Sequence, residues 1–82
     1  MISYRPPSRE PDPRFERARE DVEFHFGHIP AHKRIALAAL RKLEDGDKLG
    51  FEGELWWMWE LMRQADVKSI CLKHDIFEAV AA

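Results

Sequence analysis

The stretch Glu54-Leu55-Trp56-Trp57-Met58-Trp59-Glu60-Leu61-Met62-Arg63-Gln64 holds all three tryptophans of the chain and two of its three methionines. The spacing i, i+3, i+4, i+7 gathers side chains on one face of a helix, and four large apolar residues follow it here: Leu55, Met58, Trp59 and Met62. The stretch therefore predicts a helix. Because one indole can bury roughly 150–250 Å², we expect the rest of the domain to pack around it. Trp57 falls opposite that face and Trp56 at its edge, so these two indoles are expected to remain available for contacts.

Length and composition limit what kind of protein this can be. A chain of 82 residues is one small domain, in which a single core is only just sufficient and oligomerisation often adds stability. A net charge of −2 lacks the basic character of a nonspecific nucleic-acid binder. Cys71 is the only cysteine, which excludes an internal disulfide and fits a reducing cytoplasm. No apolar run has the length of a signal peptide core or a membrane span, so we expect a cytoplasmic protein without a membrane partner.

The first helix has clear start and stop signals. Prolines at positions 6, 7 and 11 predict an extended arm over residues 1–11, followed by a single helical domain over residues 12–82. Asp12 followed by Pro13 predicts the helix start, and Gly27 is expected to end it in the left-handed conformation. Phe24 lies on the far side, where either a later element or a partner is expected to cover it. The apolar stripe of this helix is Phe15, Ala18, Val22 and Phe26.

The second helix is expected to run from about Ala31 to Asp45 and to end at Gly46. The short link before it predicts an antiparallel hairpin with the first helix. Its apolar stripe is Ile35, Ala36, Ala39, Leu40 and Leu43.

The later residues are less strongly patterned. Three glycines predict a loop over residues 45–53. Residues 67–73 fit a short strand or a helix, and we favour the helix. Capping-box spacing between Asp75 and Glu78 predicts a last helix over residues 76–81. The expected fold is all-α: a helical hairpin, the Trp-rich third helix packed across it, and a short C-terminal helix.

Ligand types that zinc prefers are present, but their spacing does not align them. Gly27 and Pro30 interrupt the helix that would bring the first three histidines together, so we expect separate histidines and no metal site. These residues are His25, His28, His32, Cys71 and His74.

The sequence offers no catalytic arrangement. Ser69 and Cys71 lie close to His74, yet no third group is evident that would orient the histidine as a base. No Gly-rich phosphate loop occurs, and no cofactor is indicated. We therefore expect a protein that is not an enzyme.

Residues 1–45 carry the run Tyr4-Arg5-Pro6-Pro7 and then Arg14-Phe15-Glu16-Arg17-Ala18-Arg19-Glu20. A proline-marked turn then leads into an Ala/Leu-rich helix with Leu43-Glu44 near its end. In this order these features resemble the small helical-hairpin proteins that phages use to sequester cyclic nucleotide signals of bacterial immunity. The resemblance implies an oligomer in which Tyr4 stacks on a base and basic groups hold phosphates. Lys33 and Arg34 are the candidates for the phosphates, at positions that no motif of that family fixes. The chain departs from the family in its tighter turn and in everything after Glu44.

Two functions follow as expectations. The first is a small non-enzymatic binding protein that uses exposed aromatics to contact a protein, either a second copy of itself or a host target, because aromatics are enriched at interface hot spots. An inhibitor or adaptor of phage or mobile-element type, including an anti-defence protein, fits this size. The alternative is a sponge for a cyclic nucleotide or another small anion that uses Tyr4, Lys33 and Arg34. The expected contact residues of the first function are Phe24, Phe51, Trp56 and Trp57.

Overall fold

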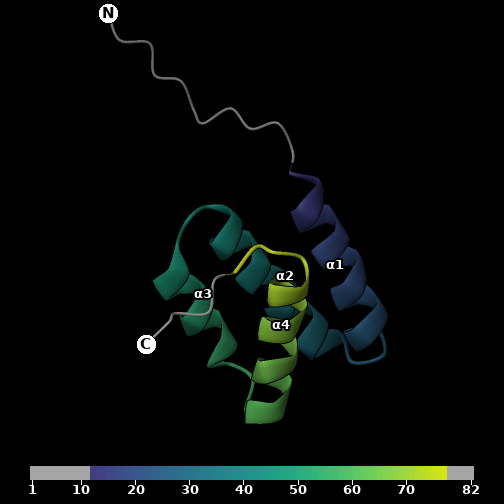
Figure 1. The fold of residues 1–82 in the computed structure, drawn as a ribbon. Coiled ribbons are helices and arrows are strands. Elements are labelled where there is room, and N and C mark those ends of the chain that lie inside the picture. Colours follow the sequence, from purple (N-terminus) through teal and green to yellow (C-terminus); the bar gives the residue numbers. More distant parts are fainter. Residues whose placement is uncertain (1–11, 78–82) are drawn as a thin grey trace, which may run out of the picture.

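A computed structural model of the chain describes residues 12–77. They form four helices, α1 (Pro13–Phe26), α2 (Pro30–Glu44), α3 (Lys48–Leu55) and α4 (Leu61–Lys73), shown in Figure 1. No strand occurs within this range, so the all-α prediction is confirmed. The predicted arm and residues 78–81 of the predicted last helix lie outside the described residues. Ile76 and Phe77, which belonged to that predicted helix, are not helical.

The start of α1 follows its sequence signals. The Asp12 carboxylate accepts a hydrogen bond from the backbone N–H of Arg14 at 3.0 Å, and Pro13 occupies the first turn. Hydrogen bonds from Arg14 also hold the pKa of Asp12 at about 2.

The prediction for Gly27 is wrong in its backbone conformation. Gly27 is right-handed, at φ −59° and ψ −26°. A glycine is still required there, because a Cβ atom would collide with the carbonyl oxygen of Glu23. Gly46 after α2 does take the left-handed conformation, at φ 81°.

Helix α2 lies at the centre of the fold. It packs against α1 and α3, while α4 packs against α1 (Figure 1). The Arg19 guanidinium lies 3.1 Å from the Glu44 carboxylate, which ties α1 to the end of α2. Both predicted stripes face this core, although Ile35 is only partly buried. Their buried members are Phe15, Ala18, Val22, Phe26, Ala36, Ala39, Leu40 and Leu43.

The prediction of a loop over residues 45–53 is wrong beyond Asp47, because α3 begins at Lys48. The Asp47 carboxylate accepts a hydrogen bond from the backbone N–H of Gly50 at 2.7 Å and so caps the helix. A Cβ atom at position 50 would collide with that carboxylate, so this glycine makes room for the cap. The helix is then held by burial of Phe51 and Leu55.

The prediction of one helix over residues 54–64 is also wrong. Helix α3 ends at Leu55, where the N–H of Trp57 donates to the Glu54 carbonyl at 3.1 Å in a turn. Residues 58–60 are not helical, and Glu60 is extended at φ −94° and ψ 118°. Met58 is buried, as predicted, whereas Trp59, predicted to face the core, is exposed to solvent.

Helix α4 confirms the helical interpretation of residues 67–73 and buries Val67 and Cys71. None of the described helices combines the length and apolar character that crossing a bilayer requires.

Candidate functional site

The connection between α3 and α4 exposes an unusual amount of apolar surface. The exposed fractions are 77% for Trp56, 70% for Trp57, 94% for Trp59 and 76% for both Leu61 and Met62. The three indoles alone present roughly 400–600 Å². This is about the size of the largest apolar patch on a typical soluble monomer, and such a patch is often functional. We call these five side chains the Trp surface.

Buried contacts hold this connection in place. Met58 is 1% exposed and anchors the segment in the core between the indoles. The Gln64 side chain of α4 donates to the Met58 carbonyl at 2.7 Å, so the first turn of α4 fixes the same residue. His32 of α2 lies 3.9 Å from the Glu60 carboxylate. The indoles are therefore presented on a positioned backbone.

Two grooves meet at Trp57. The first, the Trp groove, has a volume of about 360 Å³ and is lined by Trp56, Trp57, Met58, Trp59, Leu61 and Gln64. The second, the α2 groove, has a volume of about 390 Å³ and is lined by Ala31, Arg34, Ile35, Ala38, Glu54 and Trp57. One indole thus forms a wall of both grooves.

The structure separates the four predicted contact residues. Trp56 and Trp57 are exposed and lie together on the Trp surface. Phe51 is 0% exposed, so its prediction as an exposed contact residue is wrong. It lies four residues before Leu55 on α3, in the core, and its ring centroid is 5.2 Å from that of Phe77. Trp59, which the sequence assigned to the core, joins the site instead.

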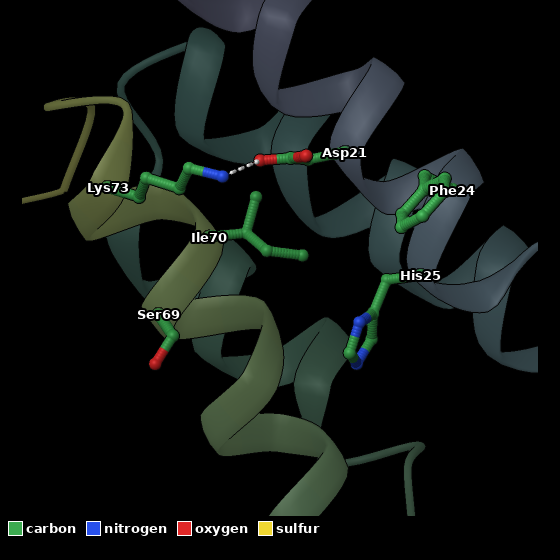
Figure 2. Close-up of a pocket in the computed structure, with 6 residues that line it drawn as sticks. All are labelled: Asp21, Phe24, His25, Ser69, Ile70 and Lys73. Carbon is green, nitrogen blue, oxygen red and sulfur yellow. Dashed lines mark ion pairs between the residues drawn. The ribbon is translucent and has the colours of Figure 1, made fainter.

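Phe24 lies on another part of the molecule, at a cleft between α1 and α4 (Figure 2). It is 88% exposed, so none of the described elements covers it. The cleft has a volume of about 250 Å³, with Ile70 at its centre and Ser69 on its α4 side. The side chain of His25, below Phe24 in the view, lies 3.3 Å from the Asp66 carboxylate.

Asp21 ties α1 to the end of α4. Its carboxylate lies 2.6 Å from His74 Nε2 and 3.2 Å from Lys73 Nζ, the second pair being drawn in Figure 2. The hydrogen bond from His74 is the main cause that lowers the pKa of Asp21 below its ordinary value; burial opposes it, and the hydrogen bond and charge of Lys73 add to the lowering.

Replacing Asp21 with asparagine is expected to lower the free energy of unfolding at neutral pH by roughly 1 kcal/mol, the size expected of a charged hydrogen bond that solvent partly screens. Because the folded pKa lies below the ordinary 3.8, the wild-type contribution is present above about pH 4. It is lost as the pH falls through the folded value. Thermal melts from pH 7 to pH 3 should therefore show the Asp21→Asn deficit shrinking in acid. Glu20→Gln, an exposed neutralisation on the same helix, is the control. A deficit that stays constant over this range would contradict the assignment.

The described structure contains two of the three predicted anion-binding residues, Lys33 and Arg34. Tyr4 lies outside the described residues. Lys33 is half-buried and Arg34 is exposed, and only Arg34 lines the α2 groove. Within residues 12–77 neither cation forms an ion pair.

The histidines and the cysteine are dispersed. His25 and His74 pair with different aspartates, and His32 lies near Glu60. Cys71 is buried, and burial raises the pKa of its thiol to about 12. No cluster of three or more His, Cys, Asp or Glu side chains that could hold a metal ion occurs in the described part of the chain.

Comparisons of the sequence with protein-family models and curated proteins, and of the fold with solved structures, find no match. The Trp surface and the grooves beside it are therefore the features of the molecule from which we infer a function.

Proposed function

We propose that this is a small non-enzymatic binding protein that acts through protein–protein contacts made by the Trp surface, either with a second copy of itself or, as an inhibitor or adaptor, with another protein. The observation that carries the proposal is the arrangement of residues 56–62, in which Met58 is buried while the three indoles around it are 70–94% exposed. Tryptophan is among the residues most enriched at interface hot spots. A fold that uses a buried residue, Met58, to hold three indoles exposed to water is suited to docking.

The free energy gained by covering the indoles supports docking. At about 25 cal/mol per Å², covering roughly 400–600 Å² of indole corresponds to about 10–15 kcal/mol of transfer free energy. Association costs roughly 4–15 kcal/mol, so covering the indoles contributes a free energy of the same order as that cost. Contacts by Leu61, Met62 and the groove walls then provide the surplus. The positioned backbone reduces the entropy lost on binding.

The remaining polar groups support a non-enzymatic function. The histidine–aspartate pairs formed by His25 and His74 both join α1 to α4. These pairs hold helices together, and the raised pKa of Cys71 suppresses its nucleophilic thiolate.

Alanine substitution on the Trp surface tests the proposal. Trp57→Ala and Trp59→Ala are each expected to weaken partner binding by roughly thirtyfold or more, the loss of about 2 kcal/mol typical of a hot spot. Capture by the immobilised protein from a bacterial lysate, followed by quantitative binding, measures this loss, and circular dichroism checks the fold. Leu49→Ala is the matched control, because Leu49 is 86% exposed on α3 and lines neither groove. Folded Trp variants that bind as well as wild type would refute the proposal.

A second candidate function, a sponge for a cyclic nucleotide or similar anion, is favoured by one observation. Arg34 and Trp57 both line the α2 groove, a combination that suits a phosphate and a stacked base in one site. Micromolar cyclic dinucleotide would then raise the melting temperature by several degrees. Arg34→Ala and Tyr4→Ala would each remove that rise. An unchanged melting temperature in wild type would dismiss this function.

A further inference from the structure

The Trp surface contains both protrusions and hollows. Trp59 is the most exposed indole and lines the Trp groove, while Trp57 lines both this groove and the α2 groove. In a two-fold symmetric interface the same patch faces itself, so each protrusion must meet a hollow within the same patch. Here a protruding indole and a groove of about 390 Å³ are linked by one shared residue, Trp57.

The available area matches the needs of a dimer. The indoles present roughly 400–600 Å², and a standard interface buries about 800 Å² on each partner. Leu61 and Met62, together with the apolar wall of the α2 groove, supply the difference. That wall comes from Ala31, Ile35 and Ala38.

The charges around this surface are balanced. Arg34 and Glu54 line the α2 groove, and Glu60 and Arg63 flank Leu61 and Met62 in the sequence. A second copy brings the same positive and negative side chains in equal number. A strongly acidic or basic partner would instead place a like charge opposite half of these side chains. The net charge of −2 gives only weak repulsion between copies.

We propose that the Trp surface is covered by a second copy of this chain, in a two-fold dimer with Trp57 near the symmetry axis. In this dimer Trp59 of each copy enters the α2 groove of the other. The inference rests on the proposed function and names the partner that the Trp surface binds.

Size-exclusion chromatography with light scattering at micromolar concentrations tests the dimer. The expected mass is twice the chain mass of 9.7 kDa, and it is expected to change little with salt because the contacts are mainly apolar and the charges balanced. Trp59→Ala removes the protruding indole and Ala31→Glu places a charge in the groove, so each is expected to give a monomer. Ala31 is exposed in the single chain, so this change leaves the fold intact. Leu49→Glu, at a position on α3 that is 86% exposed and lines neither groove, is the matched control and remains dimeric.

The alternative outcomes separate this inference from the proposed function. A wild-type monomer that captures another protein through Trp57 overturns the dimer and leaves the proposed function standing. A dimer that persists in both Trp59→Ala and Ala31→Glu uses another surface, which overturns the inference. A monomer that instead sediments with phosphatidylcholine vesicles, and loses this in Trp59→Ala, overturns both. If folded Trp variants keep both the wild-type mass in solution and the wild-type capture of a partner protein, the proposed function itself is refuted.

Discussion

Replacing Phe51 with alanine is expected to unfold most of the domain at room temperature. The side chain is 0% exposed and belongs to the core formed by α2 and α3. Truncating a buried phenylalanine costs about 3–5 kcal/mol, which is comparable with the whole stability of a domain this small. Urea unfolding followed by circular dichroism would show the midpoint collapse toward zero denaturant.

Phe24→Ala makes the same chemical change at a position that is 88% exposed. Its free energy of unfolding should stay within about 0.5 kcal/mol of the wild-type value, as for most surface substitutions. If Phe51→Ala instead kept a wild-type midpoint and lost only binding, Phe51 would be a contact residue and the description of α3 would be wrong.

The thiol of Cys71 is expected to react with an aromatic disulfide reagent about a thousandfold more slowly in the folded protein than in the unfolded chain. Burial raises its pKa from the ordinary 9.0 to about 12, and thiolate is the reactive form. Three pKa units reduce the thiolate fraction near pH 8 by about a thousandfold, before any steric protection. Absorbance of the released thiol, with and without denaturant, measures both rates.

A neighbouring position provides the control for this protection. Leu72 follows Cys71 on α4 and is 47% exposed. A cysteine introduced by Leu72→Cys in a Cys71→Ala background should therefore react at nearly the unfolded rate. Fast labelling of wild-type Cys71 without denaturant would show that α4 does not pack as described.

The hairpin was predictable because its signals are local. Asp12 and Pro13 mark the start of α1, Gly46 ends α2, and each helix carries one unambiguous apolar stripe. The three-residue link then determines how the two helices meet. Nothing from a distant part of the chain was needed for this half of the fold.

The second half was not predictable in this way, because two stripes compete for the same residues. Leu55 and Met58 belong to two possible helical stripes. One begins at Phe51 with the spacing i, i+4, i+7, and the other continues to Met62. The structure follows the first stripe, which packs α3 against α2. No glycine or proline between residues 54 and 64 marks the break before α4. The choice depends on tertiary packing, which local spacing does not encode.

The residues of the candidate site also divide into those whose exposure the sequence predicts and those whose exposure it does not. Trp56 and Trp57 fall outside either stripe, so their exposure could be predicted. Trp59 was misplaced because the longer stripe includes it, and Phe51 because three glycines nearby suggested a loop. The contact between Asp21 and His74 joins residues 53 positions apart, which no spacing rule anticipates.

The burial of Met58 between exposed indoles also decides what the protein's fluorescence reports. All three tryptophans lie on the solvent side of the fold, so their emission in the free chain should already resemble that of an indole in water. Unfolding would then shift the emission maximum little, whereas any molecule that covers these rings would shift the maximum to shorter wavelength. The chain thus carries an intrinsic optical probe of its own docking.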